Sequence, residues 1–211
     1  MSKMRAPILD SDLDVATLSD LDDADLDAVE VDGCALAKQA ATSVRFNGVR
    51  LLGGDLSETK VKGLSWLDVE CVRTQLPLVD WPGSKLTRVA FRDARATGAR
   101  LPGAELQDVR FAGCQLDYAS FVGARFSRVV FEKCRLRDAD FGGADLSGTQ
   151  FVDCDLTGVT FVGAKLVGAD IRTCVGEDLR VEARDIRGLI VNRSQAAALA
   201  GLLGLVVRDD A

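Results

Sequence analysis

The hydrophobic residues of this chain recur at a strict interval of five positions. From Leu21 to Ile186 this register gives 34 sites, and 30 of them are Leu, Ile, Val, Phe or Trp. A small or medium-sized residue precedes each site by two positions, as Ala144 precedes Leu146, and the other three positions are mostly polar or glycine. Every Phe and Trp of the chain falls in the register: Phe46, Trp66, Trp81, Phe91, Phe111, Phe121, Phe126, Phe131, Phe141, Phe151 and Phe161.

A period of five fits neither of the common secondary structures. An amphipathic helix needs apolar residues spaced by about 3.6 positions, and a half-buried strand needs sustained alternation with a period of 2. Two inward residues separated by one polar residue and followed by two more polar or glycine residues instead predict a short extended stretch that ends in a turn. We therefore expect an all-β chain that bends after every five residues.

A second period, of twenty residues, predicts how these bends close. Four five-residue sides make one square coil, and like residues then stack on like, as in the cysteine ladder and the glycine column. Pro82-Gly83 is typical of a type II turn at a corner, because proline presets one φ angle and glycine adopts the positive φ that follows. About eight coils are expected. The two columns are Cys114, Cys134, Cys154 and Cys174, and Gly63, Gly83, Gly103, Gly123, Gly143 and Gly163.

The charge of the chain, −6 in total, is concentrated at its N-terminal end. Residues 1–33 carry ten acidic side chains against Lys3 and Arg5, whereas the remainder is close to neutral. Two interpretations stay open: a solvated cap, or a site that binds a basic partner. The N-terminus lacks the apolar core of a secretory signal, and the longest apolar run, 196–207, is too short to span a bilayer, so we expect a cytoplasmic protein.

Further along the chain the outward positions alternate in sign. One column contains Lys85, Glu105 and Arg125, and a second contains Arg88, Asp108 and Arg128. Stacked opposite charges attract weakly, so these columns are expected to neutralise one another, and Arg128→Ala is expected to be nearly silent. A second group of outward residues is apolar and is either a contact patch or ordinary scatter on a surface: Leu67, Val72, Pro77, Leu78 and Tyr118.

Little in the composition supports catalysis. The chain has no histidine, the commonest general base and a frequent metal ligand. The cysteine ladder lacks a CxxC spacing and is expected to be buried packing rather than a metal or redox stack. Outward acid pairs such as Asp153 and Asp155 would lie on a convex surface, without the desolvated cleft that acid–base catalysis needs. We therefore predict no enzyme, no cofactor, no metal and no direct binding of nucleic acid or membranes.

Units such as Ala-Asp-Leu-Ser-Gly at 144–148 and Cys-Asp-Leu-Thr-Gly at 154–158 resemble the A(D/N)LXX motif of pentapeptide-repeat proteins. The resemblance covers about residues 21–190 and implies a right-handed quadrilateral β-helix, often dimeric through a C-terminal helix. It suggests three segments: an acidic N-terminal cap at 1–20, the β-helix at 21–190, and a capping and dimerisation helix with a tail at 191–211. The C-terminal segment also resembles that of pentapeptide-repeat proteins that act on DNA gyrase, including quinolone-resistance proteins.

The expected C-terminal helix covers residues 195–203, with Ser194 as its N-cap and Gly204 as its stop. On one face of this helix Leu199, Leu202 and Leu203 are the candidate cap and dimer residues.

Two functions remain open. The first is a protein, expected to be a homodimer, that acts by surface contact, with DNA gyrase or another type II topoisomerase as the partner implied by the resemblance. The chain departs from those relatives, because no loop interrupts its register and its outward columns alternate in sign. The second is a structural scaffold with no topoisomerase activity.

Overall fold

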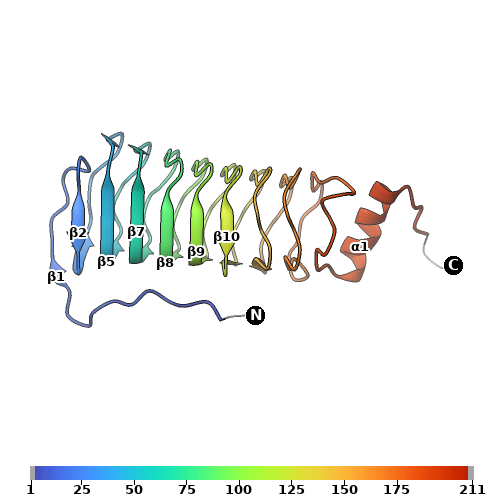
Figure 1. Ribbon diagram of the computed structural model, residues 1–211, viewed down its shortest axis with the longest axis horizontal. Helices are drawn as coiled ribbons and strands as arrows, with labels where there is room; N and C mark the ends of the chain where they lie inside the picture. Colours follow the sequence, from blue (N-terminus) through green and yellow to red (C-terminus); the bar gives the residue numbers. More distant parts are fainter. Residues whose placement is uncertain (1–2, 209–211) are drawn as a thin grey trace.

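In the computed structural model, which describes residues 3–208, the chain forms a rod of stacked coils (Figure 1). Met1, Ser2 and residues 209–211, which belong to the two predicted terminal segments, lie outside the described residues. The N-terminal residues run along the side of the rod, and the helix α1 closes the opposite end. The all-β class and the four-sided coil that the five- and twenty-residue periods predict are both confirmed.

Successive coils are joined by parallel strands in a constant register. Phe111 pairs with Phe91 of the preceding coil and with Phe131 of the next coil, so each pairing joins residues that are twenty positions apart. The strands are β1 (Asp14–Val15), β2 (Asp25–Asp27), β3 (Val29–Asp32), β4 (Ala40–Ala41), β5 (Val44–Leu52), β6 (Lys60–Val61), β7 (Leu64–Val72), β8 (Lys85–Arg92), β9 (Glu105–Ala112), β10 (Arg125–Ser127), β11 (Val130–Glu132) and β12 (Gln150–Val152).

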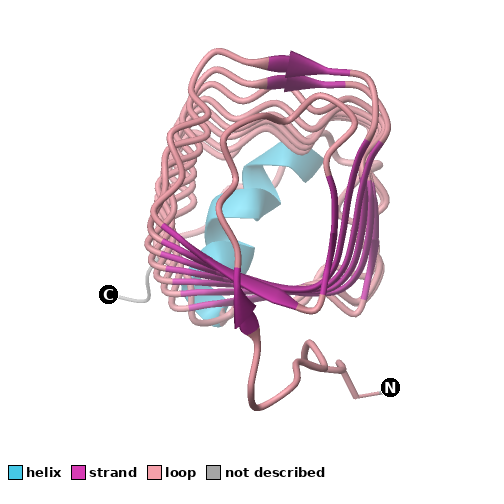
Figure 2. Cartoon of the chain, turned by 90° about the vertical axis from the view of Figure 1, so that its left-hand side faces the viewer, coloured by secondary structure: helices cyan, strands magenta, loops and turns pink. Residues whose placement is uncertain are grey.

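The four sides of the coil are not equivalent. The long strands β5, β7, β8 and β9 each cover two adjacent sides and the corner between them, whereas the other two sides are mostly turns joined by isolated bridges (Figure 2). The corners impose left-handed backbone on ordinary residues as well as glycines, as at Arg88 and Asp108, whose φ angles are 52° and 56°. Glycine is free of strain in this conformation, so Gly103, with φ at 65°, suits the turn after Pro102.

The interior is a dry stack of apolar side chains. Phe91, Phe111, Phe131 and Phe151 lie above one another with ring centroids 4.8, 4.8 and 5.0 Å apart and nearly parallel planes. A second stack on another side places Phe141 5.2 Å from Phe121. Each buried aromatic ring contributes about 1.5–3 kcal/mol of transfer free energy, as an upper bound. The rod is held together mainly by these ladders.

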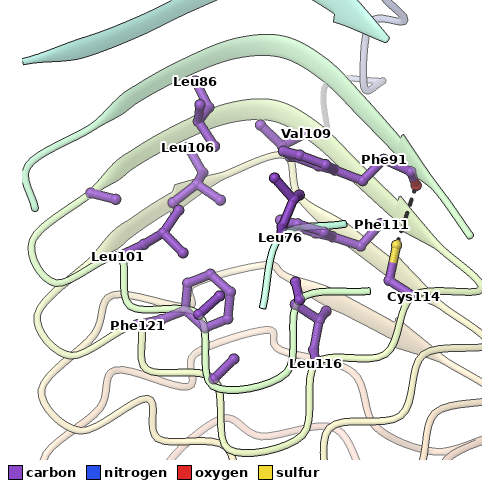
Figure 3. Close-up of a cluster of buried hydrophobic side chains, with 14 of the residues drawn as sticks. Leu76, Leu86, Phe91, Leu101, Leu106, Val109, Phe111, Cys114, Leu116 and Phe121 are labelled. Atoms are coloured by element: carbon purple, nitrogen blue, oxygen red, sulfur yellow. Dashed lines mark hydrogen bonds between the residues drawn. The ribbon is translucent and has the colours of Figure 1, made fainter. Parts of the chain in front are cut away.

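Figure 3 shows part of this interior, the buried side chains around Phe91, Phe111 and Phe121, and a small cavity remains among them. Ala96 stands in a column that carries leucine in the coils before and after it, at Leu76 and Leu116. Three alanines, among them Ala94 and Ala99, face a cavity of about 20 Å³ enclosed by apolar side chains. The cavity is no larger than a water molecule needs, so it is a packing defect and not a ligand site.

The two ends of the rod depart from the regular coil, which makes about 6 turns, slightly fewer than the eight predicted. At the N-terminal end β1 pairs with β3 at an offset of fifteen residues, so the first coil is incomplete. At the C-terminal end Gly176, at a site where leucine is usual, brings its backbone close against Leu156, and a Cβ there would lie 2.7 Å from the carbonyl carbon. The chain then leaves the repeat and enters α1 (Arg193–Ala200) and the short 3₁₀ helix η1 (Gly201–Leu203).

Candidate interaction surfaces

The outer surface of the rod carries ion pairs between successive coils, as the alternating columns predict. Arg50 lies between two acids, with Nη1 3.1 Å from Glu30 Oε2 and Nε 3.2 Å from Glu70 Oε2. In a second column, Arg125 Nη1 lies 3.1 Å from Glu105 Oε1. Exposed pairs of this kind contribute only about 0–1 kcal/mol each. Their main consequence is that these columns present paired charges and not a continuous field of one sign.

One corner column differs from the others, and we call it the carboxylate ladder: Asp68, Arg88, Asp108 and Arg128. Arg88 binds Asp68 through two hydrogen bonds, Nε–Oδ1 at 2.7 Å and Nη2–Oδ2 at 2.6 Å. Arg128 binds Asp108 in the same way, at 2.7 and 2.8 Å. Asp68 is 7% exposed and Asp108 is 2% exposed, which is unusual for carboxylates on the outside of a rod.

The N-terminal residues account for this burial. Residues 3–9, which we call the arm, extend along the side of the rod (Figures 1 and 2) and contact the carboxylate ladder. The backbone N–H of Ile8 donates to Asp68 Oδ1 at 2.9 Å, and that of Arg5 donates to Asp108 Oδ1 at 3.1 Å. The start of the predicted N-terminal cap is therefore a strap along the side of the rod, whereas Leu18 and Leu21, further along, are buried in the first coil.

The electrostatics of the ladder favour ionised carboxylates. The Arg128 guanidinium lowers the pKa of Asp108 from its ordinary value against the opposing effect of burial, and the N–H and charge of Arg5 lower it further. Burial acts to raise the pKa of Asp68, but the hydrogen bonds from Arg88 and from the Ile8 N–H outweigh it, so this pKa is also lowered. Both side chains are charged acceptors near neutral pH.

The C-terminal end of the rod is closed by α1. The N-cap is Asn192, not Ser194, and the helix begins two residues earlier than predicted: Asn192 accepts the Gln195 N–H at 3.0 Å, and Gln195 Oε1 accepts the Asn192 N–H at 2.9 Å. Gln195 Nε2 also donates to the carbonyls of Ile171 and Cys174 at 2.8 and 3.0 Å. Because asparagine and glutamine bind each other and the last coil, they fix the helix on the end of the rod.

The three leucines predicted on one helix face divide between two roles. Leu199 packs against the core, and it lines a hollow of about 400 Å³ together with Leu202 and residues 176–179. Leu203 is 59% exposed and lies in η1, and Gly204 ends that helix with a φ of 73°. The residues that follow are exposed and apolar as well: Leu205, Val206 and Val207.

The cysteines are packing residues in this structure. All six are buried free thiols. In the cysteine ladder each thiol donates to a phenylalanine carbonyl of the preceding coil, as Cys134 Sγ does to Phe111 O at 3.4 Å. Burial raises the pKa of the Cys71 thiol well above its ordinary value, which makes it a poor nucleophile. Within residues 3–208 no group of three or more Cys, Asp or Glu side chains is arranged to hold a metal ion.

The remaining candidate residues do not converge on a reactive site. Asp155 forms an ion pair with Arg137, whose Nε donates to Asp155 Oδ2 at 2.6 Å. Partial burial acts to raise the pKa of Asp155, but the hydrogen bonds from the Thr157 hydroxyl and from Arg137 outweigh it and hold this pKa below its ordinary value. The carboxyl is therefore not poised as a general acid. Of the outward apolar residues, Leu78 and Tyr118 are 59% and 65% exposed. No helix in the described part of the chain has the length and apolar character to cross a membrane.

The sequence pattern missed the contact between the arm and the carboxylate ladder. It treated Asp108 and Arg128 as ordinary surface residues because the five-residue register says only that they point outward. Two signals point to the contact in retrospect. Lys3 and Arg5 are the only bases in an otherwise acidic terminal segment. Ala90 interrupts an outward column that carries Glu30, Arg50, Glu70 and Arg110 in the other nearby coils.

Stacked four-sided coils with a filled apolar interior and ion pairs outside define a β-solenoid, a class of protein that presents extended surfaces rather than a deep cleft. Two family models match this chain: pentapeptide repeats, in eight copies, over residues 134–172, and a pentapeptide repeat region over residues 79–141. Both models describe pentapeptide repeats, so residues 79–172 of this chain carry that repeat. No curated protein matches the chain.

Solved structures of pentapeptide-repeat proteins resemble it at low identity. HetL from the cyanobacterium Nostoc sp. strain PCC 7120, involved in heterocyst differentiation regulation, is 20% identical over 85% of this chain and 86% of its own, with a TM-score of 0.41. Rfr23 from the cyanobacterium Cyanothece 51142 is 19% identical over 58% of this chain and 91% of its own, with a TM-score of 0.46. QnrB1, a plasmid-mediated fluoroquinolone resistance protein, is 20% identical over 94% of this chain and 100% of its own, with a TM-score of 0.40.

Proposed function

We propose that this chain is a non-enzymatic, cytoplasmic protein that acts by contacts of its surface with other proteins, and that it does so as a homodimer held by its C-terminal segment. The observation that carries the proposal is the run of exposed apolar side chains beyond α1, which are 41–79% exposed: Leu202, Leu203, Leu205, Val206 and Val207. A contiguous apolar surface of this kind at the end of a rod favours association.

A second copy of the chain is the proposed occupant of this surface. The hollow beside α1 is lined by Leu179, Leu199 and Leu202, and the exposed leucines and valines lie directly after it in the chain. A two-fold axis at this end would place the apolar tail of each copy against the hollow of the other, so that one patch serves both subunits. The resemblance to pentapeptide-repeat proteins with C-terminal dimerisation helices supports the same arrangement.

Light scattering after size exclusion tests the dimer. The wild-type chain is expected to dimerise with a Kd of about 1 µM, equivalent to about 8.2 kcal/mol of binding free energy, and should therefore elute mainly as a dimer at about 10 µM. Leu202→Asp combined with Leu203→Asp should give a monomer whose circular dichroism is unchanged, because both side chains are exposed. Leu78→Asp, at an exposed apolar position distant from this end of the rod, should remain dimeric. A monomeric wild-type chain would refute this part of the proposal.

The resemblance suggests a type II topoisomerase as the partner. The ion-paired columns do not form a uniformly negative face, but the first coils do expose several acids, among them Asp22, Asp27 and Asp32. A supercoiling assay with purified gyrase, with and without a quinolone, tests this partner. Altered supercoiling or drug protection at micromolar protein would support it. Unchanged activity in both arms would leave the alternative, a scaffold with no effect on topoisomerases.

A further inference from the structure

The arm is a polypeptide segment already seated on the rod. Its two main contacts are the hydrogen bonds from the N–H groups of Arg5 and Ile8 to Asp108 and Asp68. The donors are backbone groups and the acceptors are charged side chains, which makes the bonds stronger than neutral ones. The carboxylate ladder therefore recognises the main chain of the arm, which any extended polypeptide also offers.

The spacing of the acceptors matches an extended chain. Asp68 and Asp108 lie two coils apart, about 9.6 Å at ~4.8 Å per stacked strand. Arg5 and Ile8 lie three residues apart, which is about 9.3 Å at ~3.1 Å per residue of a polyproline II segment, and the three residues per turn of that extended conformation bring the N–H groups of i and i+3 to the same side. Arg88 and Arg128 hold the two carboxylates in position through bidentate pairs. The ladder is thus matched in length to the N–H groups of residues i and i+3 of an extended segment.

The rod is recessed where the arm crosses it. Ala90 replaces the long charged side chains of its outward column and is only 6% exposed beneath the arm. A cavity of about 260 Å³ remains between arm and rod, lined by Met4, Pro7, Ala90 and Arg110 among others. The arm therefore fills the recess incompletely, and a segment with larger side chains at the positions of Ala6 and Pro7 would fit it.

The contacts of the arm are few. Ile8 is 70% exposed, and Lys3, Arg5 and Ala6 are also exposed. Segments with few buried apolar contacts open at low free energy. The arm carries two cations, Lys3 and Arg5, and Arg5 is the residue whose N–H reaches Asp108, so the competitor that most resembles the arm has a cation at the same place.

We propose that the carboxylate ladder is a docking groove for an extended basic segment of a partner protein, and that the arm occupies this groove until such a segment displaces it. This inference rests on the proposed function, because it names the surface through which a partner is bound. The occupant is defined by three features: free N–H groups at i and i+3, a cation at i, and side chains that fill the recess over Ala90.

Binding of a peptide to the full-length chain tests the groove. The probe is a fluorescein-labelled peptide with the sequence of residues 1–12, followed by fluorescence anisotropy. In the wild-type chain the arm competes at an effective concentration of about 1 mM, so the peptide should bind weakly. Ile8→Pro removes the N–H that Asp68 accepts and frees the groove, so the peptide should bind this variant about tenfold tighter or more.

Two matched variants make the result specific. Ala6→Pro also creates a Pro-Pro pair but retains both N–H donors, and it should behave as the wild type. In the Ile8→Pro chain, Asp68→Asn with Asp108→Asn should weaken peptide binding about tenfold, because the amide oxygens are uncharged acceptors. Thermal melts establish which variants fold, and Asp68→Asn alone replaces the double variant if the latter does not.

Two outcomes would overturn the inference: no peptide binding to the Ile8→Pro chain, or equal binding when the carboxylates are replaced. Either outcome leaves the C-terminal dimer and the topoisomerase assay untouched, so the groove can fail without the proposed function. Hydrogen exchange provides a second measurement. The amides of Arg5 and Ile8 should exchange more slowly in the wild type than in the Asp68→Asn, Asp108→Asn chain, and equal rates would also refute docking of the arm.

Discussion

Arg128 and Asp108 lie one coil apart on the outside of the rod and form a bidentate ion pair in which the carboxylate is almost completely buried. The bonds are 2.7 Å for Nε–Oδ1 and 2.8 Å for Nη2–Oδ2, and Asp108 is 2% exposed. The sequence pattern places both residues at the surface and predicts that Arg128→Ala is nearly silent. The structure corrects that expectation, because the arm covers the carboxylate and leaves Arg128 as its main partner.

Arg128→Ala should therefore destabilise the fold by about 2 kcal/mol. Removing one member of a buried pair leaves an uncompensated charge, which costs about 3–5 kcal/mol when the site is fully closed, and less here because Arg128 itself is partly exposed. Urea unfolding measures the change. Arg125→Ala is the matched control: Arg125 pairs with Glu105 in the open, so its loss should cost about 0–1 kcal/mol. Equal effects of the two substitutions would show that the arm does not bury the ladder.

The stability of the chain should depend on acid through the same carboxylates. The pKa of Asp108 in the folded chain is lowered from 3.8, mainly by Arg128. A carboxyl with a lowered folded pKa contributes stability above its unfolded pKa, and this contribution is lost as the pH falls through the folded value. The difference in unfolding free energy between wild type and Asp108→Asn should thus be constant above about pH 5 and shrink below about pH 4. A difference independent of pH would contradict the ion pair.

The cavity beside Ala96 predicts a stabilising substitution. Leucine occupies the equivalent inward site in the coils before and after, and the cavity is lined by apolar side chains alone. Ala96→Val should fill the space and raise the unfolding free energy by about 0.5–1 kcal/mol, measured as a higher Tm. Ala144→Val is the control, since Ala144 is fully buried and does not line this cavity, and the same enlargement there should cost about 1–3 kcal/mol. If both substitutions lowered the unfolding free energy by similar amounts, the space near Ala96 would already be filled.

The inward residues could be predicted from the sequence because a repeat turns one local rule into a global one. Each Phe or Leu at the central site satisfies the same packing requirement, and the twenty-residue column fixes its neighbours, so Phe111 and Phe131 could be placed in contact before any coordinates. Side chains that point outward obey no such rule. Whether an outward carboxylate is solvated or covered depends on segments distant in sequence, and Arg5 lies 103 residues from Asp108.

The ends of the rod were hard to predict for a related reason. The repeat stops there, and local propensity must choose among several polar residues. Ser194 and Asn192 are both good N-cap residues in isolation. The last coil makes the choice between them. Asn192 Nδ2 donates to the carbonyl of Arg172, and Gln195 Nε2 donates to the carbonyl of Ile171, at 2.8 Å each. The preference for Asn192 as N-cap depends on contacts with residues about twenty positions away, so it cannot be predicted from the local sequence.

This choice of N-cap yields a last prediction. Asn192→Ala should destabilise the C-terminal cap by about 1–2 kcal/mol, because it removes both the acceptor for the Gln195 N–H and the donor to the Arg172 carbonyl. Ser194→Ala should lower the unfolding free energy by about 0.5 kcal/mol at most, because the Ser194 hydroxyl makes one exposed hydrogen bond, to Asn192 Oδ1. Hydrogen exchange of residues 193–200 reports the local effect, and urea unfolding reports the global one. If Ser194→Ala were the more damaging substitution, the helix would begin at the later cap that the sequence alone suggests, and the contact of α1 with the last coil would have to be redrawn.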